Sequence, residues 1–178
     1  MVSDDRPAPS GWITRFAHLA HGAVLDVACG SGRHTAFFAG ENLPVTAIDR
    51  DISRLGGLRY HPKVTVLEAD LESETPWRPD PAAWDTIVVT NYLWRPLLPH
   101  LVSALRPGGV LIYETFAAGN EAFGKPANPE FLLQPGELLD VVGTSLTVIA
   151  YEHGEVADPN PAVVQRICAL RGETIARL

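Results

Sequence analysis

Two glycines separated by one residue, Gly30 and Gly32, follow a short apolar run that contains an acid, Asp26. Glycine lets the backbone reach conformations that a Cβ forbids, including those with positive φ. A strand, a glycine turn and a helix N-terminus in that order form a nucleotide-binding cradle. A carboxylate at the strand end would repel a pyrophosphate. We therefore expect Asp26 to face a ligand with a positive or hydrogen-bond-donating end.

Two further aspartates end the next two apolar runs. Asp49 lies 17 residues after Gly32, close to the roughly 20 expected for the acid that binds a ribose diol. Asp70 ends the run after that. In an open α/β sheet the ligand crevice lies beyond the carboxyl ends of the strands, so the three acids should line one edge of it. A dinucleotide-binding dehydrogenase would need a third glycine where Thr35 stands.

These residues resemble the first motif of the class I S-adenosylmethionine-dependent methyltransferases, which reads acid-x-Gly-x-Gly-x-Gly. This chain has Asp26-Val-Ala-Cys-Gly-Ser-Gly32, with Ala28 in place of the first glycine. The stretch Arg106-Pro-Gly-Gly-Val-Leu111 resembles a second hallmark, the turn into the fifth strand. The similarity extends from about Leu19 to the C-terminus and is distantly like the tellurite-resistance type.

The resemblance implies that the cofactor is S-adenosylmethionine, that the product is S-adenosylhomocysteine, and that no metal is needed. Gly30 and Gly32 would pack under the methionine part, Asp49 would hold the ribose hydroxyls, and Asp70 with Leu71 would meet the adenine. His34 and Arg33 would contact the cofactor carboxylate or only cap the helix. The expected cofactor contacts are Asp26, Ala28, Gly30, Gly32, Arg33, His34, Asp49, Arg50, Asp70, Leu71 and Asn91.

A methyl acceptor should sit beyond the fourth and fifth strands. Methyl transfer from a sulfonium needs alignment and exclusion of water more than it needs acid–base help. Where the acceptor carries a proton, Glu114 is the first candidate for a general base and Tyr92 the second. The long connection over 117–134 is expected to be a lid that contains aromatic residues, among them Phe131. The candidate substrate contacts are Tyr92, Trp94, Arg95, Phe116 and Phe123.

Composition limits the classes of partner. The net charge of −7 disfavours a nucleic-acid substrate, because proteins that follow phosphate backbones are usually basic. Cys29 and Cys168 have no CxxC spacing and are expected to be reduced, in the cytoplasm. No leader peptide is recognisable, and no apolar run approaches the ~20 residues of a membrane helix. We expect a monomer or a homodimer.

The elements that must position these residues alternate between strand and helix, which predicts a mostly parallel sheet with right-handed crossovers. Residues 1–9 are expected to be a flexible N-terminus and 10–178 a single methyltransferase domain, with Ser10 as a helix cap. The predicted class is α/β: a Rossmann-like, doubly wound, mostly parallel seven-stranded sheet with a C-terminal antiparallel hairpin and helices on both faces. Strands are predicted near 23–28, 45–49, 64–68, 84–90, 110–116, 147–151 and 163–170, and helices near 10–20, 32–40, 52–58, 96–105 and 135–142.

We therefore predict a methyltransferase that acts on a small molecule. Two alternatives remain open: a non-catalytic module that binds the cofactor, and an RNA or protein methyltransferase that works with a partner chain. The acceptor, the methylated atom, the use of a base and the oligomeric state are not determined by the sequence.

Overall fold

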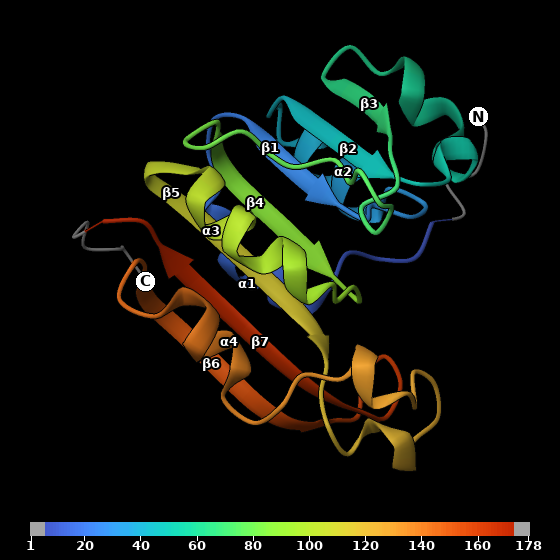
Figure 1. The fold of residues 1–178 in the computed structure, drawn as a ribbon. Coiled ribbons are helices and arrows are strands. Elements are labelled where there is room, and N and C mark those ends of the chain that lie inside the picture. The colour runs from blue at the N-terminus through green and yellow to red at the C-terminus, as the bar shows by residue number, and fades with distance from the viewer. Residues whose placement is uncertain (1–5, 173–178) are drawn as a thin grey trace.

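The computed structural model describes residues 6–172 and contains one seven-stranded sheet with the strand order β3-β2-β1-β4-β5-β7-β6 (Figure 1). Pairing is parallel from β3 through β5, whereas β7 is antiparallel to both β5 and β6. The predicted sheet, with its C-terminal hairpin, is confirmed. The strands are β1 (Val24–Val27), β2 (Val45–Asp49), β3 (Val64–Glu68), β4 (Trp84–Thr90), β5 (Leu105–Phe116), β6 (Thr147–Val156) and β7 (Ala162–Leu170).

Helices cover both faces of this sheet (Figure 1). One face packs against α1 and α2, and the other against α3 and α4. The α-helices are α1 (Gly11–Phe16), α2 (Arg33–Gly40), α3 (Leu98–Ala104) and α4 (Glu137–Val142). The 3-10 helices are η1 (Ala17–Leu19), η2 (Ile52–Tyr60), η3 (Arg95–Leu97), η4 (Asn120–Ala122) and η5 (Pro129–Phe131).

The strand order creates the crevice that positions the site. The chain builds β1, β2 and β3 outward to one edge, then returns to place β4 on the other side of β1. At such a switch point the loops after the two central strands separate, and a ligand can enter between them. Both central strands are mostly apolar because both of their faces are covered; all four residues of β1 are buried, Asp26 among them.

The sixth strand extends to Val156, beyond the predicted 151, and three other elements differ from the sequence prediction for a visible reason. The first helix is α-helical only to Phe16 and continues as the 3-10 turn η1, although Ser10 caps it as expected by accepting a hydrogen bond from the Trp12 N–H. The predicted helix near 52–58 is the 3-10 segment η2, because Gly56 interrupts it with a non-helical conformation. The expected turn before the fifth strand lies inside β5 as a register shift against β4. A Cβ on Gly109 would lie 2.9 Å from the Arg106 carbonyl oxygen, so this shift requires glycine there.

The connection over 117–134 is folded back on the sheet. Ala117 forms a bridge with Leu133, which closes the base of the connection. The buried Asn120 side chain donates to the Pro126 carbonyl and accepts from the Val163 N–H, at 3.0 and 3.1 Å. The predicted lid thus has a fixed base, and its outer part carries η5.

The start of the chain packs on the glycine turn. Residues 1–5 of the stretch expected to be flexible lie outside the described residues. Arg6 donates through Nε to the Ser31 carbonyl oxygen at 2.9 Å and through Nη2 to the Leu55 carbonyl oxygen at 3.2 Å. Arg6 therefore connects the N-terminal segment to the glycine turn and to η2.

Candidate functional site

The glycine turn between β1 and α2 uses three positive φ values. Gly30 and Gly32 have φ of 57° and 78°, and Gly32 is the N-cap of α2. A Cβ on Gly32 would lie 2.6 Å from Leu55 Cδ2, so glycine is needed there for space as well as for conformation. Ala28, which stands where the resembled motif has its first glycine, also has a positive φ, of 51°. This left-handed conformation costs an alanine about 1–2 kcal/mol.

Asp49, at the end of β2, holds this turn in place. Its Oδ2 accepts the Gly30 N–H at 2.8 Å, and its Oδ1 accepts the Asp51 N–H at 3.0 Å. The side chain is half-buried and lines a cavity, so one face of the carboxylate remains open to a ligand. The ribose-binding aspartate expected from the spacing therefore lies beside the glycine turn.

Asp26 lies elsewhere than the sequence pattern suggests. Only 1% of the residue is exposed, and its Oδ2 accepts a hydrogen bond of 2.6 Å from the Thr35 hydroxyl on α2. Burial raises the pKa of Asp26 to about 6. The carboxylate is not part of the cavity lining. It thus connects β1 to the first turn of α2 and does not face an open ligand space.

His34 is also turned inward. Its Nε2 accepts the Ser10 N–H at 3.1 Å, and its Nδ1 lies 3.3 Å from the Thr90 hydroxyl. Burial, together with the nearby Arg33 guanidinium, lowers the pKa of His34 to about 3. The ring is therefore neutral, with its proton on Nδ1. It joins the N-terminal segment to α2 and to the end of β4.

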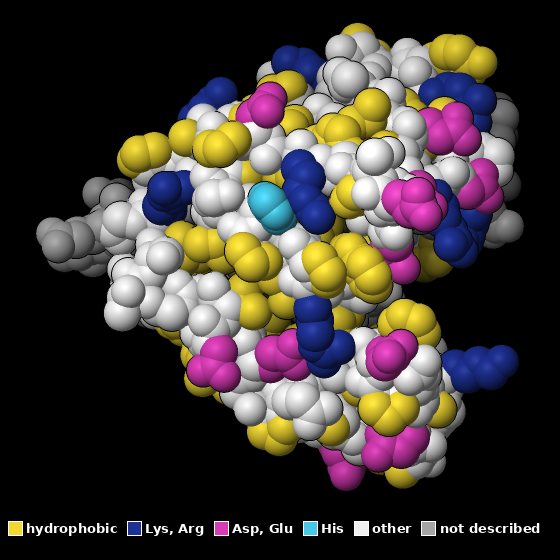
Figure 2. Space-filling model, viewed as in Figure 1, with side chains coloured by type: hydrophobic (Ala, Val, Ile, Leu, Met, Phe, Trp, Pro, Cys, Tyr) yellow, Lys and Arg dark blue, Asp and Glu magenta, His cyan; other side chains and the backbone are white. Residues whose placement is uncertain are grey.

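A cavity of about 290 Å³ opens beyond the carboxyl ends of β1–β4. In the space-filling view the molecule is hollowed on one side, between the body of the sheet and the part that carries residues 117–134 (Figure 2). Of the expected contacts, Ala28, Asp49, Arg50, Asp70, Leu71 and Tyr92 lie together here, whereas Gly30, Gly32, Arg33, His34 and Asn91 are not part of the lining. The lining residues are Ala28, Asp49, Arg50, Ala69, Asp70, Leu71, Glu72, Tyr92 and Phe131.

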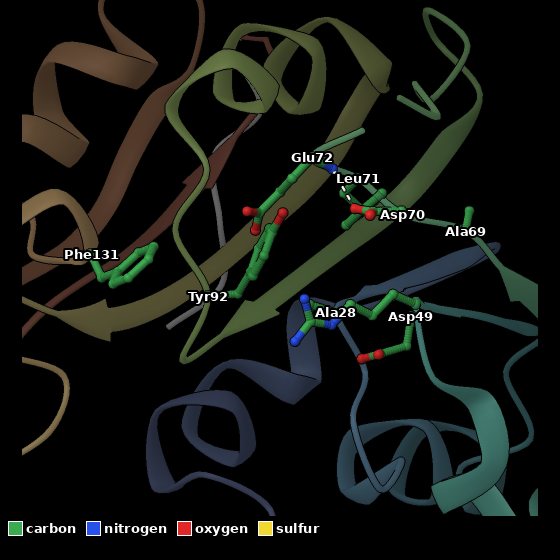
Figure 3. A pocket seen from close by; sticks show the side chains of 9 residues that line it. Ala28, Asp49, Ala69, Asp70, Leu71, Glu72, Tyr92 and Phe131 are labelled. Carbon is green, nitrogen blue, oxygen red and sulfur yellow. Dashed lines mark hydrogen bonds between the residues drawn. The ribbon is translucent and has the colours of Figure 1, made fainter. Parts of the chain in front are cut away.

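The segment after β3 supplies a carboxylate to the lining of this cavity. The Asp70 side chain is exposed and accepts the Glu72 N–H at 2.8 Å, which orients both residues (Figure 3). Leu71 is buried between them. The Asp70 carboxylate is therefore held by the backbone N–H of Glu72, with oxygen lone pairs left for a ligand.

Tyr92 follows β4 and lies beside Glu72 (Figure 3). The Tyr113 hydroxyl donates to the Tyr92 carbonyl oxygen at 2.7 Å, which fixes the backbone there. Burial and the Glu72 carboxylate raise the pKa of the Tyr92 phenol. A phenol with a raised pKa stays protonated, so Tyr92 is suited to donate a hydrogen bond and not to act as the base that the sequence suggested.

Glu114 makes two contacts away from the cavity. Its Oε1 accepts from the Ser10 hydroxyl at 2.6 Å, and its Oε2 accepts from Arg166 Nη1 at 3.1 Å. Its side chain is only 13% exposed. The first candidate for a general base is thus committed to holding the start of α1 against β5 and β7.

The Arg95 side chain is likewise occupied by hydrogen bonds within the protein. It pairs with Glu137 through two hydrogen bonds of 2.7 and 3.0 Å, and it donates to the carbonyl oxygens of Glu130 and Leu132. These bonds pin the outer part of the 117–134 connection to α4. Among the other expected substrate contacts, Trp94 packs against the core, Phe116 is half-buried and Phe123 is 44% exposed; none of the three lines the cavity.

Glu72 and Ala69 were not predicted as site residues, and Phe131 was noted only as a lid aromatic. Glu72 comes two residues after Asp70, the predicted adenine-binding acid, so the sequence spacing could have identified it as a site residue. Phe131 reaches the cavity only because the connection after β5 folds back, which no local pattern indicates. Within residues 6–172 no group of three His, Cys, Asp or Glu side chains is placed to hold a metal ion.

The sheet order and the glycine turn define the class I methyltransferase type of α/β fold, and comparisons with known proteins agree. The sequence model of the methyltransferase domain family matches residues 24–109. A ubiquinone biosynthesis O-methyltransferase of Burkholderia vietnamiensis is 30% identical over 122 residues, which cover 64% of this chain and 53% of that protein. The chain thus spans about half the length of the curated relatives it matches.

Two solved structures show the same fold. TehB from Haemophilus influenzae superposes with a TM-score of 0.74 at 17% identity, covering 95% of this chain and 64% of that one. A 1,6-didemethyltoxoflavin-N1-methyltransferase of Burkholderia thailandensis, solved with 1,6-didemethyltoxoflavin and S-adenosylhomocysteine, gives 0.65 at 18% identity, covering 91% and 76%. The chain thus has the fold of these S-adenosylmethionine-dependent methyltransferases, and its residues 24–109 match the methyltransferase domain model.

Proposed function

We propose that this protein transfers a methyl group from S-adenosylmethionine to a small molecule. The observation that carries the proposal is the cavity at the β1–β4 switch point, bounded by Asp49 and Asp70. Asp49 fixes the glycine turn and still presents its carboxylate to the cavity. A ligand with a ribose diol and an exocyclic amine would satisfy both carboxylates.

The charge of the lining favours this ligand over a diphosphate-bearing coenzyme. Asp49, Asp70 and Glu72 supply three carboxylates against the one guanidinium of Arg50. A sulfonium is attracted by such an excess of negative charge, and a pyrophosphate is repelled. In our proposal Asp49 binds the ribose hydroxyls, Asp70 and Leu71 meet the adenine, and Arg50 lies beside the nucleoside.

The buried residues of the turn act on the cofactor through the backbone. Asp26 and Thr35 fix the first turn of α2, and His34 ties that turn to Ser10. The backbone of Gly30 and Gly32 would then support the methionine part. We assign Asp26 and His34 as positioning residues, and Arg33 and Asn91 as flanking residues at the ends of the same site.

We propose that the methyl acceptor is a small molecule. We also propose that the protein works in the cytoplasm. The similar proteins named above act, by their names, in ubiquinone biosynthesis and on 1,6-didemethyltoxoflavin. Both cysteines are free and buried, which suits a reducing compartment. No helix in the described part of the chain is long and apolar enough to cross a membrane. We propose a monomer or homodimer, to be tested by gel filtration with light scattering.

Calorimetric titration with S-adenosylhomocysteine tests the proposal. We expect one site per chain, with affinity reduced about tenfold by Asp70→Asn, the usual effect of removing a charged hydrogen-bond partner. Asp80→Asn is the matched control, because Asp80 is exposed and outside the lining. No binding at millimolar ligand would refute the proposal. Binding without release of S-adenosylhomocysteine from S-adenosylmethionine, with any acceptor offered, would favour a non-catalytic binding module.

A further inference from the structure

One end of the cavity contains three residues that the cofactor assignment leaves unused. Glu72 follows β3, Tyr92 follows β4, and Phe131 ends η5. They come from three segments that are distant in sequence and line the same cavity. Figure 3 shows the Glu72 carboxylate and the Tyr92 hydroxyl next to one another, with Phe131 across from them. We call this set the acceptor end.

Tyr92 provides a hydrogen-bond donor that has no settled partner. Its hydroxyl oxygen is buried and faces the Glu72 carboxylate outside standard hydrogen-bond geometry, and no other acceptor among residues 6–172 bonds to it. A buried hydroxyl without a partner costs about 1–3 kcal/mol. A polar atom of a bound molecule would remove that cost.

Phe131 provides an exposed apolar surface at the same place. It is 44% exposed, although the surrounding backbone is firmly held by Arg95, which donates to the carbonyl oxygens of Glu130 and Leu132 at 2.6 and 2.9 Å. An aromatic ring on a firmly held backbone beside a cavity can cover a flat ligand at a low cost in conformational entropy.

Glu72 determines the charge that this end accepts. Once a cofactor covers Asp49 and Asp70, the Glu72 carboxylate is the remaining negative group of the lining. An anionic ligand placed between Tyr92 and Phe131 would be repelled by this carboxylate, with Arg50 as the one cation of the lining, whereas an O–H or N–H group would bind to it.

We propose that Glu72, Tyr92 and Phe131 form the acceptor subsite, and that it takes a flat molecule, uncharged or cationic, that carries an O–H or N–H group. The Phe131 ring covers the plane of this molecule, Tyr92 donates to it, and Glu72 accepts from it. This inference rests on the proposed function and adds the chemical class of the acceptor.

The test uses three phenols of matched shape: 4-hydroxybenzylamine, 4-hydroxybenzyl alcohol and 4-hydroxybenzoate. Their dissociation constants are measured by ligand-observed NMR on the full chain, saturated with S-adenosylhomocysteine and also without it. We expect the amine and the alcohol to bind at least about tenfold more tightly than the benzoate, because one carboxylate a few ångströms away attracts the first and repels the last. Glu72→Gln should bring the three constants to within about threefold of each other.

Glu74→Gln is the control, because Glu74 is an exposed carboxylate two residues further on that does not line the cavity. It should leave the preference unchanged, and thermal melting checks that both variants fold. The inference is overturned if the benzoate binds as tightly as the amine, if the preference survives Glu72→Gln, or if none of the three phenols binds. Failure of S-adenosylhomocysteine to bind is seen separately in the first titration, and it overturns the proposed function instead.

Discussion

The buried carboxylate of Asp26 should destabilise the fold as the pH rises, and Asp26→Asn should remove this effect. Burial raises the pKa of Asp26 from 3.8 to about 6. A carboxyl group with a raised pKa stabilises the folded state only while it is protonated in that state. Its contribution is therefore complete below the unfolded pKa of 3.8 and is lost as the pH rises toward 6.

The magnitude follows from the two pKa values. At 1.36 kcal/mol per unit, a shift from 3.8 to about 6 makes ionised Asp26 cost about 3 kcal/mol at high pH. Between pH 5 and pH 8 the cost grows by roughly 1.4 kcal/mol. Asparagine does not ionise, so the stability of the variant relative to the natural protein should increase by that amount over this range. In the Asp26→Asn variant the hydrogen bond from the Thr35 hydroxyl is weaker. This lowers the free energy of unfolding of the variant by an amount that does not depend on pH.

Urea unfolding of both proteins at several pH values measures this difference directly. Asp51→Asn is the control, because hydrogen bonds from Ser53 lower the pKa of Asp51. That variant should lose relative stability as the pH rises through the acid range, which is the opposite sign. A difference between Asp26→Asn and the natural protein that stays constant from pH 5 to pH 8 would refute our reading of Asp26 as a buried positioning residue.

Three further predictions concern the turn and the lid. Gly32→Ala should lower the free energy of unfolding in urea by about 2–4 kcal/mol, because its Cβ would meet Leu55 at 2.6 Å in a left-handed conformation. The control Gly57→Ala, which has open space around the new Cβ, should lower it by about 1 kcal/mol or less. Ala28→Gly should raise stability by about 0.5–1 kcal/mol, and an unchanged or lower melting temperature would argue against strain at φ 51°. Arg95→Ala should lower the free energy of unfolding by about 1–2 kcal/mol, a modest loss because the ion pair with Glu137 is partly exposed. It should also speed amide hydrogen exchange over 130–137, since Arg95 no longer binds the carbonyl oxygens there. Unchanged exchange in this segment would show that Arg95 does not hold the lid.

The sequence predicts most of the sheet because its strands are short apolar runs bounded by glycine, proline or aspartate. Runs of this kind are typical of buried parallel strands. Their carboxyl ends meet at one edge, so the positions of Asp49 and Asp70 beside one cavity follow from the pattern alone. The structure supports this part of the reasoning from sequence.

The direction of individual side chains was harder to predict. Asp26 pairs in register with Ala47 and Val88 and points to the face covered by α2, where Thr35 meets it. The pattern identified the acid but not the helix above it. Glu114 was predicted from the end of β5, yet its partner Ser10 lies 104 residues away in sequence. Such contacts depend on the packing of distant segments, and no local spacing encodes them.

A crystal structure with S-adenosylhomocysteine tests the central claim most directly. Our account predicts density for the ligand in the cavity beyond β1–β4, with the ribose at the Asp49 carboxylate and the adenine amine at Asp70. Density only in a separate hollow, whose lining includes Arg6, Pro9, Arg33 and Phe37, would contradict the account. A dinucleotide bound on the glycine turn in place of the sulfonium-derived ligand would contradict it equally.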